Sequence, residues 1–268
     1  MKRLSLILAD LKRRLKGVSR LRQYKLAAPL PVSDTMSDIE KLFWTNTGPV
    51  VDKWLHYLPL YDRYLSKYRG TPVRMLEIGV YKGGSLNLWR RWLGQDAVIF
   101  GIDIDPDCAA VNGIAGQVRI GSQADQDFLR KVVAEMGGID VVLDDGSHMG
   151  RHIRASLDTL FPLLSETGIY LIEDVHTGYS RRYDGGRFNR FNFIRLLSTL
   201  TDDIHHWYHT RGQQVAATAD TLVGIHIHDS LIVLEKGRKV RPAHYRVGSL
   251  QASAAQTPAF AGDKTRAD

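Results

Sequence analysis

Carboxylates follow four apolar segments of this 268-residue chain, at positions where each segment gives way to a loop. Like charges that gather at one place repel each other, so a group of acids is costly unless a cation meets it. The row therefore predicts a site for a cationic ligand, a metal ion or both. Its members are Glu77, Asp103, Asp144, Asp145, Glu173 and Asp174.

A glycine-rich turn follows the first of these acids, in LEIGVYKGGS. An acid two residues before Gly79 would repel the pyrophosphate of a dinucleotide but suits the cationic S-adenosylmethionine, although the turn alone does not separate the two cofactors. Asp103 is placed to accept the two ribose hydroxyls of either cofactor, and Gln123 falls where an adenine edge would lie. The predicted cofactor-binding residues are Glu77, Gly79, Tyr81, Ser85, Asp103, Gln123 and Asp144.

The later acids have the donor types of a magnesium site. Asp145, Glu173 and Asp174 come at the ends of successive predicted strands, and neighbouring strands lie about 4.8 Å apart. Oxygen donors without cysteine favour a hard cation, Mg²⁺ before Ca²⁺. The alternative is that these acids cap helices or bind the nearby Arg151 and Arg154.

His148 follows Asp145 by three residues, in DDGSH. A divalent ion lowers the pKa of a hydroxyl that it holds, and a histidine can take up the proton near neutral pH. We predict that Asp145 and His148 are catalytic and that His148 is a general base, the alternative being a loop histidine that only forms hydrogen bonds. His176 either supports the metal site or lines the substrate pocket.

The elements that position these residues alternate between strand and helix. Apolar runs typical of strands buried on both faces predict strands over 73–78, 97–103, 116–120, 139–144 and 168–173. Helical spacing predicts helices over 84–93, 107–113, 124–136, 150–164 and 187–210. Residues 221–237 predict an antiparallel pair of strands. The chain is thus expected to be α/β, with a mostly parallel seven-stranded sheet, a terminal antiparallel hairpin and an N-terminal helical segment.

The two ends of the chain differ from its middle. Residues 1–27 hold nine Lys or Arg against one acid, with a leucine stripe, and predict a basic amphipathic arm. This arm either lies on an anionic membrane or is a frayed or partner-docking helix. Residues 249–268 have too little apolar content to order themselves and predict a disordered tail.

Between these ends we expect two parts. Residues 28–70 predict a linker and a helical lid or substrate segment, with a helix over 37–45 and an aromatic one over 50–70 that Pro59 kinks or divides. Residues 71–248 predict the catalytic domain.

Composition limits the compartment and the partners. One cysteine excludes an internal disulfide and a thiolate cluster, and no apolar run approaches the roughly 20 residues of a membrane span. The apolar residues 4–8 are too few for a secretion signal. The net charge is +7, but outside the arm it is nearly balanced, so we expect no nucleic-acid partner. The predicted location is cytoplasmic, with membrane contact through residues 1–27 if the arm is interfacial.

The motifs together resemble the class I, Rossmann-like methyltransferases that methylate sugar hydroxyls with S-adenosylmethionine and Mg²⁺, of the mycinamicin or macrolide-sugar type, some of whose relatives are labelled cephalosporin hydroxylases. LEIGVYKGGSLNLW, GIDIDPDC, GSQAD, VVLDDGSH and LIEDVHTGY carry the resemblance, over roughly residues 50–235. The resemblance implies a homo-oligomer and a methyltransferase domain over residues 71–248. It also implies metal ligands at Asp145, Glu173 and Asp174, a base at His148, and cofactor contacts at Glu77, Gly79 and Asp103.

The acceptor is then a sugar hydroxyl on a glycoside, a glycolipid or a glycosylated natural product. The sequence leaves three alternatives. A nicotinamide-dependent oxidoreductase would need a pair such as Tyr-x-x-x-Lys, which the chain lacks. An iron oxygenase would use His226, His228 and Asp229. A non-catalytic glycan- or membrane-binding module would have no use for the repulsion among the acids.

Overall fold

The computed structural model describes residues 31–186, 189–208, 218 and 220–248. The predicted arm at 1–27 and the predicted tail at 249–268 lie outside these residues. In the described part no helix combines the length and the apolar character that crossing a membrane requires.

Two helices precede the sheet. α2 (Asp38–Trp44) begins with a capping box, in which the Ser37 hydroxyl accepts from the Glu40 backbone N–H and the Glu40 carboxylate accepts from that of Ser37. After a short 3-10 helix, α3 (Leu58–Leu65) follows.

Pro59 lies in the first turn of α3, where proline has no N–H to lose and a backbone already suited to a helix. It therefore begins the helix. The predicted helix over 50–70, which Pro59 was expected to kink or divide, begins only at Leu55, and Pro59 lies in the first turn of α3.

The sheet has seven strands in the order β3-β2-β1-β4-β5-β7-β6. The first five are parallel, and β7 runs antiparallel to both β5 and β6, which confirms the predicted fold class. The strands are β1 (Arg74–Ile78), β2 (Val98–Asp103), β3 (Gln117–Ile120), β4 (Ile139–Asp144), β5 (Leu164–Ile172), β6 (Leu222–Ile227) and β7 (Ile232–Lys236). The strand order reverses between β1 and β4, the place where such sheets bind ligands.

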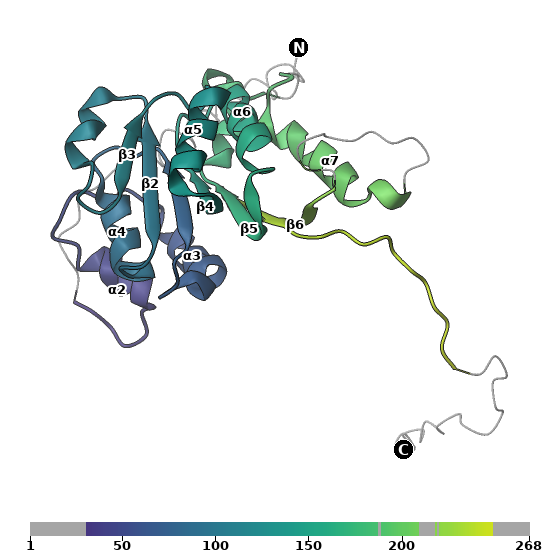
Figure 1. Cartoon of the computed structure of the whole chain (residues 1–268), viewed down its shortest axis with the longest axis horizontal. Helices are drawn as coiled ribbons and strands as arrows, with labels where there is room; N and C mark the ends of the chain where they lie inside the picture. Colours follow the sequence, from purple (N-terminus) through teal and green to yellow (C-terminus); the bar gives the residue numbers. More distant parts are fainter. Residues whose placement is uncertain (1–30, 187–188, 209–217, 219, 249–268) are drawn as a thin grey trace, which may run out of the picture.

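Helices cover both faces of this sheet (Figure 1). The helices that follow its strands are α4 (Gly84–Leu93), α5 (Gln126–Met136), α6 (Gly150–Leu160) and α7 (Phe193–Ile204). The predicted helix over 107–113 is instead a 3-10 helix at Pro106–Val111, which Asp105 caps by accepting from the backbone of Asp107.

The core forms two layers because successive strand residues point to opposite faces. Met75 and Val141 pack with α2, α3 and α4, whereas Leu76 and Val142 pack with α5, α6 and α7. Both faces are therefore apolar, as the near-continuous apolar runs predicted. Residues 237–248 leave the sheet as an extended segment (Figure 1).

Candidate active site

The carboxyl ends of β1, β4 and β5 lie level with one another. Strand register pairs Ile78 with Asp144, and Asp144 with Ile172. The loops that follow these strands therefore bring Asp145 and Asp174 to one rim of the sheet. We call this edge the acid rim; it comprises Glu77, Asp145, Glu173 and Asp174.

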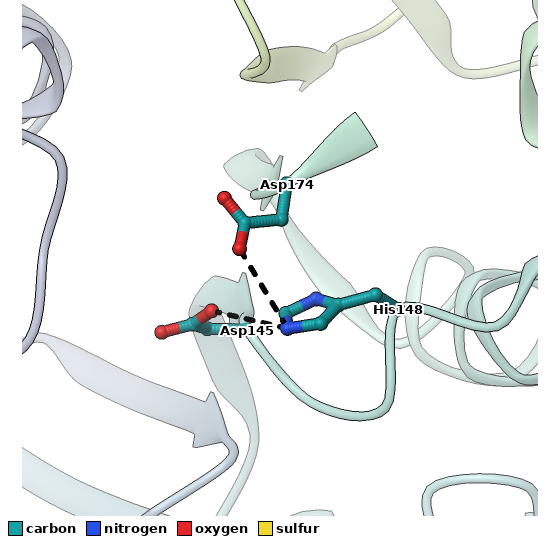
Figure 2. A group of neighbouring side chains, drawn as sticks. All are labelled: Asp145, His148 and Asp174. Atoms are coloured by element: carbon teal, nitrogen blue, oxygen red, sulfur yellow. Dashed lines mark ion pairs between the residues drawn. The ribbon is translucent and has the colours of Figure 1, made fainter. Parts of the chain in front are cut away.

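Asp145, His148 and Asp174 converge at the centre of the rim (Figure 2). His148 Nε2 lies 4.0 Å from Asp145 Oδ1 and 3.8 Å from Asp174 Oδ2, and one donor atom from each residue lies within 4.8 Å of the other two. All three side chains are half-buried. Two carboxylates and an imidazole at this spacing can hold a cation or hold and move a proton.

His148 and Asp174 both have backbones in the left-handed region, with φ of 56° and 54°. Residues other than glycine rarely adopt this conformation, and it costs about 1 kcal/mol or more unless the surroundings impose it. Such positions cluster where function requires a particular side-chain direction, and here both side chains point into the same space (Figure 2).

Residues 49–57 cross the rim, and we call them the strap. Gly84, at the first turn of α4, makes this close passage possible, since a Cβ there would lie 2.0 Å from the carbonyl oxygen of Val50. The strap brings Lys53, Trp54 and Tyr57 onto the acids.

Lys53 lies among three carboxylates of the rim. Its Nζ is 2.5 Å from Asp145 Oδ2, 2.9 Å from Glu173 Oε2 and 3.8 Å from Glu77 Oε1. Only 2% of its side chain is exposed. Burial alone would lower the pKa of Lys53, but the nearby carboxylates outweigh it and raise that pKa well above its usual value, so the group is an ammonium.

The other two strap residues hold Asp174. Trp54 Nε1 donates to Asp174 Oδ1 over 3.0 Å, and the Tyr57 hydroxyl donates to the same oxygen over 2.9 Å. This leaves Oδ2, which faces His148. One oxygen of Asp174 is thus fixed by the strap and the other is directed at the centre of the site.

Glu77 is fully buried at the end of β1. Its carboxylate accepts from the Ser85 hydroxyl over 2.8 Å and from Trp89 Nε1 over 3.2 Å, both on α4. Burial raises the pKa of Glu77 to about 7, against the opposing effect of Lys53 and these two donors. Glu77 thus joins the start of α4 to the acid rim.

Asp103, at the end of β2, shapes the glycine turn. Its Oδ2 accepts from the backbone N–H groups of Val80 at 2.8 Å and Tyr81 at 3.0 Å. Burial raises the pKa of Asp103, but backbone N–H donors outweigh it and the net shift is downward, so the group is a carboxylate. In the same turn, Gly79 has φ of +96°, and a Cβ there would lie 2.2 Å from the Asp145 carbonyl oxygen. The glycine turn and the acid rim are therefore in direct contact.

Gln123 and Asp144 face each other. Gln123 Nε2 donates to Asp144 Oδ1 over 3.0 Å, while its Oε1 accepts from the Ser147 backbone over 2.7 Å. Asp144 also accepts from the hydroxyls of Ser156 and Tyr170, and it is 2% exposed. These contacts hold the loop after β4, and a direct contact of either side chain with a cofactor stays a prediction.

Three other histidines were singled out from the sequence: His176, His226 and His228. His176 Nδ1 is 3.9 Å from Asp174 Oδ1 and bonds the Ser230 hydroxyl. His228 Nε2 bonds the Tyr64 hydroxyl at 2.8 Å, and His226 Nε2 lies 3.1 Å from Glu235. Within the described residues, the metal-type grouping is Asp145, His148 and Asp174, so the structure does not support the iron-oxygenase alternative.

The two arginines that the sequence offered as partners of these acids, Arg151 and Arg154, pair elsewhere. Arg151 pairs with Asp184, and Arg154 pairs with Asp158. The cation that the sequence reasoning missed is Lys53. In the sequence, Lys53 is a lysine within an aromatic segment, and nothing near it in the chain indicates that acids are its partners.

A family model described as "Methyltransferase domain" matches residues 76–175. The chain is 39% identical over 197 residues to the 8-demethyl-8-(2-methoxy-alpha-L-rhamnosyl)-tetracenomycin-C 3'-O-methyltransferase of Streptomyces olivaceus, covering 69% of this chain and 50% of the relative. It is 34% identical over 204 residues to the mycinamicin VI 2''-O-methyltransferase of Micromonospora griseorubida, covering 69% and 49%. The chain thus spans about half the length of the curated relatives it matches.

A solved structure is also similar. It is the MycE methyltransferase from the mycinamycin biosynthetic pathway in complex with Mg, SAH and mycinamycin VI. The match has a TM-score of 0.65 and 31% identity, and it covers 75% of this chain and 53% of that one.

Proposed function

This chain carries a methyltransferase domain homologous to those of the antibiotic-sugar O-methyltransferases, and from this premise we propose that it transfers a methyl group from S-adenosylmethionine to a sugar hydroxyl. The observation that carries the proposal is the convergence of Asp145, His148 and Asp174 next to the glycine turn. The family match favours methyl transfer over the nicotinamide-dependent and the non-catalytic alternatives.

The cofactor is proposed to lie at the glycine turn, against Glu77, Gly79, Tyr81, Ser85 and Asp103. Negative charge at this turn suits the ammonium and the sulfonium of S-adenosylmethionine. The Asp103 carboxylate accepts three backbone N–H bonds, which hold it at the strand end where ribose hydroxyls would reach it.

The rim fits a divalent cation as well. Three of its four acids, Glu77, Asp145 and Glu173, lie within 3.8 Å of one ammonium, that of Lys53, and the fourth, Asp174, faces His148. Asp145 Oδ1 and Asp174 Oδ2 are directed to one point, and hard oxygen donors suit Mg²⁺. When bound, Mg²⁺ would supply a Lewis acid that lowers the pKa of a hydroxyl. We propose Asp145, Glu173 and Asp174 as ligands.

His148 is proposed to take the proton of the acceptor hydroxyl at Nε2. The hydroxyl oxygen then forms a bond to the methyl carbon while the bond from that carbon to sulfur breaks, which leaves S-adenosylhomocysteine. Asp145 and Asp174 lie within 4.0 Å of Nε2 and would stabilise the imidazolium that forms.

The acceptor class is proposed from the relatives, whose names describe sugars on antibiotic scaffolds. A glycosylated small molecule is therefore favoured over a glycolipid. Assembly as a homo-oligomer, a cytoplasmic location and membrane contact through residues 1–27 stay proposals.

A radiolabelled methyl donor tests the function. The full chain is incubated with labelled S-adenosylmethionine, Mg²⁺ and a panel of rhamnosylated and other glycosylated natural products, and the products are identified by mass spectrometry. We expect label on a sugar hydroxyl, loss of turnover with EDTA, and recovery with Mg²⁺. Turnover that continues after complete chelation would refute the requirement for a metal ion. Binding of NADH without binding of S-adenosylmethionine would refute methyl transfer.

The same assay tests the base. His148→Ala should lower kcat by about 10²–10⁴-fold while S-adenosylhomocysteine still raises the melting temperature as it does in the wild type. The exposed His244→Ala is the matched control and should keep the wild-type rate. A near-wild-type kcat in His148→Ala would remove the base role.

A further inference from the structure

We propose that Tyr183 is a positioning residue for the reaction. Its ring fixes the direction in which the imidazole of His148 points, and so places Nε2 where the acceptor hydroxyl loses its proton. This role rests on the proposed function, because it concerns the base of that reaction. Tyr183 itself lies outside both the acid rim and the glycine turn.

The ring of His148 needs a contact that fixes its direction. Within the described residues neither of its ring nitrogens has a hydrogen-bond partner, and the facing oxygens of Asp145 and Asp174 lie 4.0 and 3.8 Å from Nε2. Attraction between charges at this distance depends little on direction, whereas a hydrogen bond requires alignment. Since 22% of the side chain is exposed, the ring can turn towards solvent unless another group holds it.

Tyr183 provides such a contact. The centroids of its ring and of the His148 ring lie 6.3 Å apart at an interplanar angle of 65°, an edge-to-face arrangement. The guanidinium carbon of Arg182 lies 5.6 Å from the centroid of the same tyrosine ring, in a cation–π contact. Tyr183 is half-buried, and among the residues that the structure describes its hydroxyl has no hydrogen-bond partner. The ring, and not the hydroxyl, therefore makes the contact with the base.

The segment that carries Tyr183 is closed on itself. The Gly185 N–H donates to the Ser180 carbonyl over 2.9 Å, and the Gly186 N–H donates to the Gly178 carbonyl over 3.0 Å. A Cβ at Gly185 would lie 2.5 Å from both of these carbonyl oxygens, so the turn requires glycine there. A turn closed in this way gives the tyrosine ring little freedom to move.

Two further contacts tie this segment to the loop that carries His148. Asp184 Oδ2 accepts from the backbone N–H of Arg151 over 3.2 Å and lies 3.0 Å from its Nε. The hydroxyl of Thr177 lies 3.3 Å from the carbonyl oxygen of His148 and 2.7 Å from that of Asp174, the two residues with left-handed backbones. The tyrosine ring thus lies between two anchors, and it is held against the imidazole.

The order of the His148 ring can be measured without any turnover. Histidine labelled with ¹³C at Cε1 gives one NMR signal for each ring, and the signal that is lost in His148→Ala identifies the base. Full-length wild type, Tyr183→Phe and Tyr183→Leu are compared by ¹³C relaxation. We expect a rigid His148 ring in the wild type and in Tyr183→Phe, and a mobile ring in Tyr183→Leu.

Turnover gives a second readout, with an acceptor identified by the panel described above. Tyr183→Leu should lower kcat by about 10–100-fold, as a misplaced catalytic group does. Its KM for S-adenosylmethionine should not change, because the contact concerns the base and not the glycine turn. Tyr183→Phe should keep the wild-type kcat, since the phenyl ring preserves the contact. Tyr245→Leu, at a tyrosine that is 82% exposed, is the matched control and should behave as the wild type in both measurements.

A His148 ring that stays rigid in Tyr183→Leu, or a wild-type kcat in that variant, would overturn the role of Tyr183. So would a loss of kcat in Tyr183→Phe, which keeps the test decisive if Tyr183→Leu does not fold. The NMR measurement uses no methyl donor, acceptor or metal ion. A ring that becomes mobile only in Tyr183→Leu, in a protein that transfers no methyl group, would therefore refute the proposed function and leave the contact with His148 established.

Discussion

At the scale of single residues, burial sets the behaviour of the acids. Glu77 is fully buried, and its pKa of about 7 lies above the value of 4.5 for an unperturbed glutamate. A glutamate whose pKa is raised in the folded state makes the free energy of unfolding depend on pH, and its contribution to stability is fully present below pH 4.5. That contribution is lost as the pH rises towards 7, because the folded state must then bury a charge.

Glu77→Gln cannot titrate, so we expect its free energy of unfolding to fall less than that of the wild type between about pH 5 and pH 8, by on the order of 2 kcal/mol. Urea unfolding of both proteins at both pH values measures the difference. Glu166→Gln, at an exposed position on β5, should follow the wild type. A stability difference between wild type and Glu77→Gln that is constant with pH would contradict this.

The sequence predicted the acids better than their partners. An acid that ends an apolar run is visible in one stretch of letters, whereas Lys53 is separated by 92 residues from Asp145 and by 120 from Glu173. The pair Asp144 and Asp145 shows a second limit. Adjacent residues at a strand end point to opposite faces, so one lies against Ser156 and Tyr170 and the other at the rim.

At the scale of elements, the strap depends on α4. A Cβ at Gly84 would lie 2.0 Å from the Val50 carbonyl oxygen and 2.7 Å from that of Pro49, and neither backbone atom can rotate away. The first turn of α4 and the strap therefore have to move together.

We expect Gly84→Ala to destabilise the protein by about 1–3 kcal/mol, as overpacking does. It should also speed hydrogen exchange of the backbone amides in residues 50–57, because the added methyl group displaces the strap from α4. Unfolding free energies and hydrogen exchange read by mass spectrometry measure the two effects. Gly48→Ala is the control, since its added Cβ meets only the side-chain ends of Asn87 and Asn46. Unchanged exchange in Gly84→Ala would show that the strap does not rest on α4.

The parallel strands could be predicted and the strap could not. Parallel strands buried on both faces give continuous apolar runs, and β4 was predicted at its observed limits, Ile139–Asp144. The strap has no such periodicity. Its course follows from tertiary contacts, so its aromatic residues read as a helix.

At the scale of the whole molecule, charge is divided unevenly. The excess of Lys and Arg lies in residues 1–27, while the remainder is nearly neutral. If the arm is interfacial, the full chain should bind vesicles that contain anionic lipid, and deletion of residues 2–27 should abolish binding without changing methyl transfer. Co-sedimentation at low and high salt measures this, with neutral vesicles as the control. Binding that the deletion leaves unchanged would assign the arm another role.

The relatives extend beyond this chain, which spans about half of their length. The expectation of a homo-oligomer stays a prediction.

The left-handed backbones of His148 and Asp174 carry a consequence for evolution. Glycine would relax the chain at both points, so selection for heat resistance alone would favour sequences that have given up the base and a metal ligand. If both side chains are retained during laboratory evolution, selection has then acted on catalysis and not on heat resistance alone.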